Sequence, residues 1–595
     1  MATQSKRFVD NLGKIYGGYA GGFLVFVIIL AIMEQMGVPN KIIGYCFVFL
    51  TIGVYAYIGI LSRTSELSEY YVAGRVVPPV FNGMATGADW MSAASFISMA
   101  GGLYLAGYGG LGYVLGWTGG YVLVAVLLAP YLRKFGQFTV PDFLGVRYEG
   151  NTARICGVIV LFCASFTYIV AQTFGIGIIT SRFLDIPFNV AIFVGLLGIL
   201  VCSMLGGMRA VTWTQVAQYI ILIIAYLVPV VWLSITAYGN PLPQLAYGNV
   251  LAEIAQFESK LGIVKHHVAP YVDAKGQFSW VEFNNFWALV LTLMVGTASL
   301  PHILMRYFTT PNVRDARTSV GWSIFFIFLL YFTAPAYAAF AKLEVYQNVI
   351  GQPIASLPGW VQNWSEVGGL LTIKDANGDG IVQLSEFVIN QDIIVLSMPE
   401  IAGLPYVISG LVAAGGLAAA LSTADGLLLA IANALSHDIY FKMINPKATS
   451  TKRLVVARAL LVVVAIVAAA VASTRPAGII QMVAWAFSLA AAGLFAPLVL
   501  GIWWKRTTAA GAIAGMIVGF GVCAYYLVGT RYFDMPLWFG IRNISSALFG
   551  LPLAFLVTWV VSLMTQAPSK EMQNFVDSIR VPKGDLAWAK GAQHE

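Results

Sequence analysis

The sequence returns repeatedly to apolar runs of about twenty residues, the length that a helix needs to cross the hydrocarbon core of a bilayer. Only 10% of the 595 residues are charged, against about 25% in soluble proteins, and 59% are hydrophobic. We therefore expect an all-α polytopic membrane protein with about 14 transmembrane helices. The runs lie at about 17–37, 41–62, 79–106, 109–131, 153–183, 188–206, 212–238, 283–308, 318–343, 403–437, 453–473, 478–503, 508–529 and 541–565.

Basic residues mark one side of this arrangement. An even number of spans places both termini on the same side of the membrane. With the N-terminus inside, most of the 34 lysines and arginines, Arg306 among them, fall in cytoplasmic segments, as the positive-inside rule requires. No small-residue cleavage site follows the first run, so residues 17–37 are expected to stay as a helix. We expect an integral plasma membrane protein, as of a bacterial inner membrane, with both termini cytoplasmic.

Composition and motifs disfavour several other classes. No Walker-type glycine loop is present, and the tail after Thr565 is too short for a nucleotide-binding domain, so ATP-driven transport has no support. The net charge of +7 is spread over short loops, which does not indicate nucleic-acid binding. We expect no enzyme; a small membrane partner subunit is left open. The cysteines lie in apolar runs without C-x-x-C spacing, so neither disulfides nor a zinc site is expected: Cys46, Cys156, Cys163, Cys202 and Cys523.

Two of the apolar runs are interrupted in the middle. Residues 83–95 are small and polar around Asp89, and residues 296–302 contain Pro301, which removes a backbone donor. Unwound backbone at membrane depth survives only where it is buried or lines a cavity. Each break opens a group of five spans, and paired breaks in two halves indicate an inverted-repeat transporter with a midplane site. The alternative is that the glycines merely allow close packing.

This pairing divides the chain into a core and its additions. Two N-terminal helices precede the first repeat, polar extracytoplasmic segments interrupt the chain twice, and two helices and a cytoplasmic tail follow the second repeat. The expected segments are 1–78, 79–238 (first repeat), 239–282 (outer loop), 283–343 (start of the second repeat), 344–402 (outer insert), 403–505 (rest of the second repeat), 506–566 and 567–595.

The tenth run carries adjacent hydroxyls and a carboxylate. Ser422 and Thr423, together with carbonyls freed by a broken helix, suit a hard cation such as sodium. Such hydroxyls alternatively bond back to their own helix. Asp425 follows two residues later, and a charge at membrane depth is a functional candidate by default. The same holds for Asp89, which could alternatively cap the half-helix after the break.

Several stretches together resemble the sodium:solute symporter family, which includes proline, sodium/glucose and acetate permeases. The resemblance covers roughly residues 41–505. It rests on segments 70–75 (YYVAGR), 138–144 (FTVPDFL) and 206–214 (GGMRAVTWT), and on 300–308 (LPHILMRYF) and 435–440 (LSHDIY), which are nearest the acetate permease branch.

The family resemblance implies a LeuT-type core of five plus five helices with flanking helices, and a sodium site between the first and eighth core helices. The ligands it implies are the carbonyls of Gly87, Trp90 and Ala419 and the hydroxyls of Ser422 and Thr423. This hydroxyl pair resembles the proline and glucose symporters more than the acetate permeases, which supports sodium and weakens acetate as the specific solute.

A second departure from the family pattern concerns a carboxylate. Proline and glucose symporters usually carry an aspartate after the Trp-Thr pair of the fifth core helix, where this chain has Gln215. We hypothesise that the carboxylate has moved to Asp425, where it binds a second sodium ion or a proton. The alternative is that Asp425 only hydrogen-bonds Gln215 or a water.

Residues 375–386 (DANGDGIVQLSE) fit the EF-hand calcium loop. The loop has the invariant sharp-turn glycine, and its expected location outside the cytoplasm favours a structural role over a sensor. The alternative is a turn rich in Asp and Gly. The expected calcium ligands are Asp375, Asn377, Asp379, the Ile381 carbonyl, Gln383 and Glu386.

The solute site is expected beside the two breaks. No arginine or lysine is expected inside these helices to pair a carboxylate, so half-helix N-termini and hydroxyls would take that role. A short-chain monocarboxylate such as acetate, lactate or pyruvate is the first candidate solute, and an amino acid such as proline the second. A solute-sensing receptor and a channel are the alternatives to a symporter. The candidate solute-binding residues are Ser92, Ser95, Tyr168, Gln172, Thr297 and Ser299.

Overall fold

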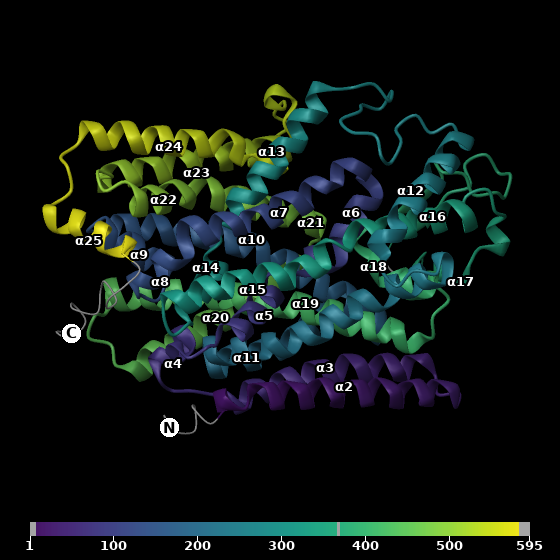
Figure 1. The fold of residues 1–595 in the computed structure, drawn as a ribbon, viewed down its shortest axis with the longest axis horizontal. Helices are drawn as coiled ribbons and strands as arrows, with labels where there is room; N and C mark the ends of the chain where they lie inside the picture. Colours follow the sequence, from purple (N-terminus) through teal and green to yellow (C-terminus); the bar gives the residue numbers. More distant parts are fainter. Residues whose placement is uncertain (1–7, 366–368, 582–595) are drawn as a thin grey trace.

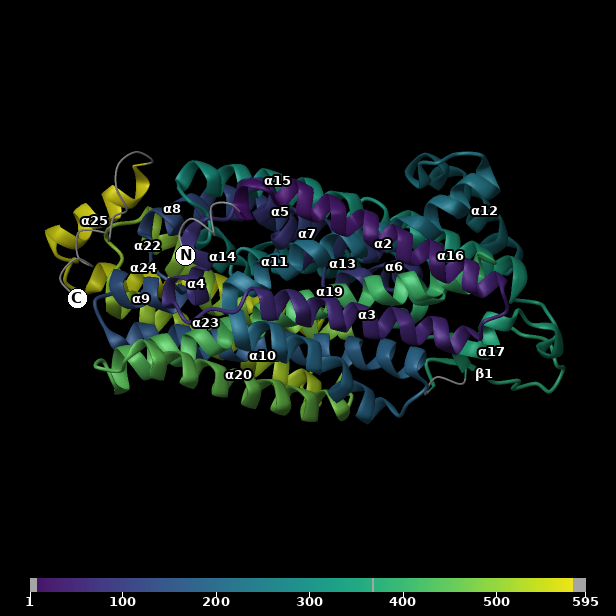
Figure 2. The same cartoon turned by 90° about the horizontal axis from the view of Figure 1, so that it is seen from below.

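The computed structural model describes residues 8–365 and 369–581 and shows an elongated bundle of long helices (Figure 1). The predicted segments 1–78 and 567–595 thus extend past the described residues at both ends. The described chain begins and ends toward the same end of the bundle, and the two long polar segments, about 239–282 and 344–402, lie at the opposite end (Figures 1 and 2). This placement agrees with an even number of crossings.

Among the described residues, 12 helical stretches are long and apolar enough to cross a membrane. Two of them, Ala94–Phe135 and Phe188–Tyr238, fold back on themselves at Gly107 (φ +56°) and Gly207 (φ +55°), where glycine adopts backbone angles that side chains disfavour. A Cβ at position 207 would also lie 2.5 Å from the Tyr70 carbonyl oxygen. Each of these two stretches therefore holds two crossings, in agreement with about fourteen predicted spans.

The ten core spans form the predicted LeuT-type arrangement of five plus five. The first five are α5 (Pro79–Trp90) with α6 (Met99–Ala106), α7 (Leu111–Leu123) with α8 (Ala129–Phe135), α10 (Asn151–Leu184), and the two limbs of α11 (Phe188–Tyr238). The second five are α13 (Trp280–Thr297) with α14 (Pro301–Phe308), α15 (Val313–Tyr331) with α16 (Ala334–Asn348), α19 (Tyr406–Asn433), α20 (Ser450–Ser473), and α21 (Ile479–Ala490) with α22 (Ala496–Trp503).

Flanking helices cover opposite sides of this core. In Figure 1, α2 (Leu12–Gln35) and α3 (Asn40–Leu61) lie along one side, and α23 (Ala509–Tyr532) and α24 (Ala547–Met564) lie along the other. Near the chain ends lie the short helices α4 (Leu67–Val72), α9 (Val140–Arg147) and α25 (Lys570–Arg580).

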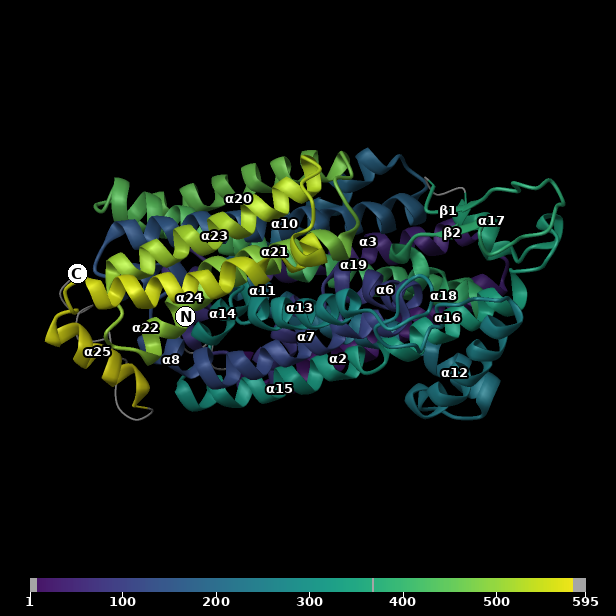
Figure 3. The same cartoon turned by 90° about the horizontal axis from the view of Figure 1, so that it is seen from above.

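The polar segments at the far end are partly ordered into secondary structure. The segment after α11 contains α12 (Pro243–Lys260), which packs on α16. The outer insert contains α17 (Gly359–Ser365), β1 (Leu371–Ile373), β2 (Phe387–Ile389) and α18 (Ile394–Ile401), as Figure 3 shows. The two strands pair antiparallel with Leu371 opposite Ile389, so they close the predicted calcium loop at its base.

Both predicted breaks are present. The first half-helix α5 ends at Trp90, Met91 leaves the helical region (φ −74°, ψ 69°), and the helix resumes through the π-helical segment η2 (Ala94–Ser98) into α6. The second break separates α13 from α14, which begins at Pro301. Proline suits this first position because its missing N–H would have no partner there. Each half of the core therefore begins with a pair of half-helices, and α5 of the first pair contacts α14 of the second.

Candidate cation and solute site

The hydroxyls of Ser422 and Thr423 point from α19 at the end of the first half-helix. Ser422 Oγ lies 2.7 Å from the Ala88 carbonyl oxygen, and Thr423 Oγ1 lies 2.7 Å from the Asp89 carbonyl oxygen. Both hydroxyls also reach the Ala419 carbonyl, at 2.9 and 3.3 Å. Five oxygens from two helices thus converge where α5 ends, and hard oxygen ligands of this kind suit sodium. The predicted carbonyls of Gly87 and Trp90 flank the two that are contacted.

Asp89 forms a buried ion pair with Arg306 of α14. Asp89 Oδ2 lies 2.8 Å from Arg306 Nε, both side chains are 0% exposed, and Arg306 Nη1 donates to Thr212 Oγ1 at 3.2 Å. Two sequence-based interpretations are therefore wrong. The expectation that no arginine lies inside these helices fails, because Arg306 is buried in α14 against Asp89. Asp89 does not cap the second half-helix, because it lies inside α5 and faces Arg306.

Glycine at position 426 permits this pair to sit against α19. A Cβ there would lie 2.3 Å from Asp89 Oδ1, so any side chain would displace the carboxylate. The close approach explains why α19 carries a glycine directly after Asp425. It also ties the first broken helix, the second broken helix and α19 into one polar contact.

Asp425 follows Thr423 by two residues on α19 and is 1% exposed. Its carboxylate accepts a hydrogen bond from Ser203, near the end of the first limb of α11. Gln215, on the second limb, instead donates to the Ser422 carbonyl at 2.7 Å. Arg306, the nearby arginine, is already paired with Asp89. Among the described residues, Asp425 therefore has no basic partner within salt-bridge distance.

The candidate solute residues divide into two groups. Ser95 shares a 2.6 Å hydrogen bond with Tyr331, Gln172 Oε1 accepts from the Ala93 amide in the first break at 2.8 Å, and Tyr168 lies edge-on to His302 in the second. These contacts lie between the two breaks. Thr297 and Ser299 instead bond back to their own helix, at 2.6 Å to the Leu293 carbonyl and 2.8 Å to the Val295 carbonyl. Ser92 lies beside the Tyr168 hydroxyl.

Aromatic rings fill the space between the two breaks. Phe487 of α21 contacts the rings of Trp90, Trp117 and Tyr168 at centroid distances of 5.5, 5.9 and 5.7 Å. His302, 1% exposed, has no hydrogen-bond partner at either ring nitrogen among the described residues, and the same holds for Gln172 Nε2. An unsatisfied buried polar group costs about 1–3 kcal/mol, so such groups mark a place that a ligand can complete.

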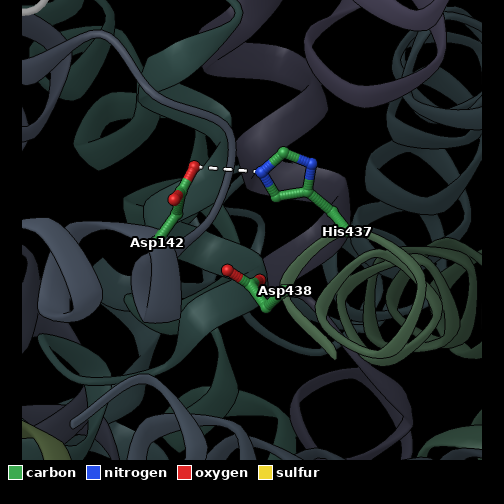
Figure 4. Close-up of side chains that lie close together, drawn as sticks. All are labelled: Asp142, His437 and Asp438. Carbon is green, nitrogen blue, oxygen red and sulfur yellow. Dashed lines mark hydrogen bonds and ion pairs between the residues drawn. The ribbon is translucent and has the colours of Figure 1, made fainter. Parts of the chain in front are cut away.

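A second buried polar cluster lies towards the chain ends, where α9 meets the π-helical segment η7 (Ala434–Ile444) (Figure 4). His437 Nε2 lies 3.1 Å from Asp142 Oδ2, and Thr139 donates to Asp438 at 2.7 Å. Arg154 contacts Asp142 at 3.2 Å and Asp438 at 3.4 Å. Burial alone would raise the pKa of Asp142, but the His437 hydrogen bond and the Arg154 charge hold this pKa below its usual value.

The carboxylate and imidazole ligand atoms of this second cluster lie within 4.8 Å of one another, close enough for a metal ion. The surrounding charges argue against one. Arg154 lies against both carboxylates, and Arg453 Nη2 lies 3.0 Å from His437 Nδ1. Because a guanidinium only donates, Nδ1 must accept, which leaves the ring hydrogen on Nε2, where Asp142 accepts it. The cluster is therefore satisfied as an ion-pair network.

The predicted calcium loop is held by its own hydrogen bonds. Asp375 accepts from the amides of Gly378 and Gly380 at 2.8 and 3.0 Å, and Glu386 accepts from Ala376 and Gln383 at 2.8 and 3.1 Å. Asn377 and the Gln383 side chain donate to Asp379. Calcium binding therefore stays a prediction.

Paired half-helices, a hydroxyl–carbonyl oxygen cluster and a LeuT-type core define a cation-coupled secondary transporter rather than an enzyme. The chain belongs to the sodium:solute symporter family, whose sequence profile matches residues 70–355 and 380–519. Membership makes it an integral membrane protein that couples a solute to sodium. The family prediction is thereby confirmed; the acetate branch stays a prediction.

Similar proteins support the assignment. An uncharacterized symporter of Cupriavidus necator is 44% identical over 98% of this chain and 100% of its own. A monocarboxylic acid transporter of Corynebacterium glutamicum is 27% identical over 90% of this chain and 93% of its own. Among solved structures, a sodium-coupled sialic acid symporter in its substrate-bound, outward-open state matches with a TM-score of 0.66 at 16% identity, over 89% of this chain and 99% of that one, which shows the shared fold.

Sequence reasoning missed Arg306, His302 and the ring of Phe487 as members of the site. One signal for Arg306 was present: it lies five residues after Pro301 inside an apolar run, and a buried Asp89 needs a counter-charge. The pairing itself joins residues 217 positions apart, which no local pattern reveals.

Proposed function

We propose that this symporter carries a short-chain monocarboxylate, acetate first among the candidates, together with sodium by alternating access. The observation that carries the proposal is the approach of Ser422 and Thr423 to the carbonyls at the end of α5. A cation in this position would join the first broken helix to α19, so that its arrival and departure shift the balance between two arrangements of the core. The proposed ligands are Gly87, Trp90, Ala419, Ser422 and Thr423.

The chemistry between the breaks supports an anionic solute. Buried donors without partners lie there on Gln172 and His302, and the nearby carboxylate of Asp89 is already paired with Arg306. A carboxylate would accept hydrogen bonds from Gln172 Nε2 and from the ring N–H of His302. The name of the Corynebacterium relative points the same way. Ser92, Ser95 and Tyr168 are proposed to line the site. Thr297 and Ser299 are proposed to line it with their backbone, because their hydroxyls bond to their own helix.

We assign a second cation to Asp425, with Gln215 beside it. Asp89 and Arg306 neutralise each other, so Asp425 is left as the negative charge of the network, and an uncompensated charge in a buried site is costly. A second sodium ion or a proton would remove that cost. The hydrogen bond from Ser203 orients the carboxylate but carries no charge.

A second cation has a large energetic consequence. A monocarboxylate anion moving with one sodium ion is electroneutral and gains only the chemical gradient, about 1.4 kcal/mol for a tenfold difference. A second cation would add about 1.4 kcal/mol from its own tenfold gradient and about 2.3 kcal/mol from its charge moving across 100 mV. Together these amount to roughly 3.7 kcal/mol, or about 500-fold more accumulation.

The proposed setting is a bacterial inner membrane with both termini cytoplasmic. The bacterial sources of the relatives and the placement of both chain ends at one end of the bundle support it. The outer insert would then face the extracytoplasmic side, where its loop of Asp375, Asn377, Asp379, Ile381, Gln383 and Glu386 is proposed to bind calcium. A calcium-dependent rise in melting temperature that Glu386→Gln abolishes would support this; equal curves with calcium and with chelator would refute it.

The test of the transport proposal is uptake by the purified full-length protein in proteoliposomes. Labelled acetate, lactate, pyruvate and proline are supplied with an inward sodium gradient and, in parallel, with choline in place of sodium. We expect sodium-dependent accumulation of the monocarboxylates above proline. Sodium-dependent uptake of proline alone would overturn the choice of solute, and uptake that ignores sodium would overturn the coupling.

A further inference from the structure

Two buried side chains on different elements lie between the helix breaks with hydrogen-bonding capacity that the described protein does not use. His302 is the second residue of α14 and its two ring nitrogens lack partners there. Gln172 lies in the middle of α10, is 0% exposed, and its Nε2 likewise lacks one. Buried polar groups in proteins are nearly always paired, so the coincidence of two such residues at one place calls for an explanation.

The orientation of Gln172 follows from its one contact. The Ala93 amide, at the start of the second half-helix of the first break, donates to Gln172 Oε1 at 2.8 Å. Only the carbonyl oxygen of a glutamine side chain can accept an N–H, so this contact fixes the amide and leaves Nε2 as a free donor of two hydrogens. Gln172 therefore caps one broken helix and offers its donors beside it.

Tyr168 connects Gln172 to His302. Tyr168 and Gln172 are four residues apart on α10, so they share one face of that helix. The Tyr168 ring lies 5.5 Å from the His302 ring at 76°, and 5.7 Å from the Phe487 ring. Tyr168 thus links the two residues with unused capacity, because it neighbours Gln172 along α10 and contacts the His302 ring, and it also contacts Phe487.

The local field favours an anion at these donors. His302 lies in the first turn of α14, where the helix end carries partial positive charge, and Arg306 follows one turn later. The partial positive charge of this helix end favours a negative ligand beside His302. The ion pair with Arg306 at Oδ2 offsets the charge of Asp89, so Asp89 attracts an ammonium group less strongly than an unpaired carboxylate would.

We infer that His302 and Gln172 bind the carboxylate of the solute, with the aromatic surface of Trp90 and Phe487 enclosing its short alkyl part. The inference rests on the proposed monocarboxylate function and names the residues that select for it. The faces of the Phe487 and Trp90 rings suit a short alkyl chain, so a solute with a small apolar part is favoured. His302 is therefore proposed to determine specificity for the carboxylate, a role that the serine and threonine hydroxyls predicted from the sequence do not fill.

The test compares solute affinity with sodium affinity in the full-length protein. Acetate uptake is measured in proteoliposomes for wild type, His302→Ala, His302→Gln and Gln172→Glu. Sodium binding without solute is followed in detergent by sodium-dependent thermal stabilisation. Loss of a hydrogen bond to a charged ligand should raise the acetate KM roughly tenfold to a hundredfold in His302→Ala. His302→Gln retains a donor and should recover part of this loss, while Gln172→Glu places a like charge beside the anion and should abolish saturable uptake.

Sodium-dependent stabilisation should stay at the wild-type level in all three variants, which shows that they fold and that the cation site is intact. His266→Ala and Gln362→Glu, changes of the same chemistry in the outer segments, are the matched controls and should leave the KM unchanged. An unchanged acetate KM in His302→Ala and Gln172→Glu would overturn this inference while the transport proposal stands. Absence of sodium-dependent acetate uptake in wild type would instead refute the transport proposal on which it depends.

Discussion

Two of the buried polar clusters in the described part of the bundle differ in how completely they are satisfied. Around His437, each ionic group has a partner of complementary charge or hydrogen-bonding capacity: Asp142, Asp438, Arg154 and Arg453 close the network. Between the helix breaks, Asp425 has only the Ser203 hydroxyl, and His302 and Gln172 keep unused capacity. The ionic groups of the first cluster are paired within the described chain, whereas the second leaves capacity for the proposed cation and anion.

This difference separates structure from function more clearly than burial does. Both clusters are fully buried, both combine carboxylates with arginines, and both join elements that are far apart in the sequence. A network that is complete in the protein alone stabilises one packing of its helices. A network that is completed only by ligands gives those ligands control over the packing, which is what a coupled transporter requires.

The largest expected effect comes from breaking the ion pair of Asp89 and Arg306 between the helix breaks. Arg306→Ala leaves Asp89 as an uncompensated buried charge, which should cost about 3–5 kcal/mol of stability. Melting curves of the detergent-solubilised protein measure this, with Lys505→Ala, which removes an exposed ion pair with Asp577, as a control expected to change stability by about 0–1 kcal/mol. The double variant Asp89→Asn with Arg306→Gln should recover part of the loss. Equal melting temperatures for Arg306→Ala and Lys505→Ala would contradict the account.

The next largest effect is expected in the dependence of uptake on membrane potential when Asp425 is changed. Asp425→Asn keeps the shape and the acceptor for Ser203 but removes the charge, so the second cation should be lost. In proteoliposomes, acetate uptake by wild type should rise with an inside-negative potential, and uptake by the variant should become insensitive to it, with a lower Hill slope for sodium. Asp185→Asn, at an exposed ion pair, is the matched control. The same potential dependence and Hill slope in Asp425→Asn as in wild type would remove Asp425 from the cation account.

A smaller effect is expected in the complete cluster. His437→Gln removes the contacts to Asp142 and Arg453 and should lower stability by about 1–3 kcal/mol, because buried partners lose their hydrogen bonds. The sodium concentration for half-maximal uptake should stay unchanged, since the cluster holds no transported ion. A stability near wild type combined with a large shift in sodium dependence would show that the two clusters are not separate in the way described.

Local pattern was sufficient to predict the spans and the two breaks, and the family resemblance implied the meeting of the Ser-Thr pair with the first break. Continuous stretches of sequence show the length of each apolar run, the position of Pro301 and the grouping of the spans into two halves. The partners of buried charges could not be found in this way. Asp89 and Arg306 lie on different half-helices, and Arg306 was counted with the cytoplasmic basic residues because such a count does not show which of them are buried. The hydroxyls of Thr297 and Ser299 drew attention as polar residues, although their own helix already satisfies them.

The most direct test of the account is the sodium dependence of acetate uptake in wild type, Ser422→Ala and Thr423→Ala proteoliposomes. Each substitution removes one oxygen from the cluster at the end of α5 without adding bulk. The account predicts saturable, sodium-dependent uptake in wild type, and in each variant a sodium concentration for half-maximal uptake that is roughly tenfold higher or more, with acetate still transported when sodium is raised. Identical sodium dependence in all three proteins would contradict it.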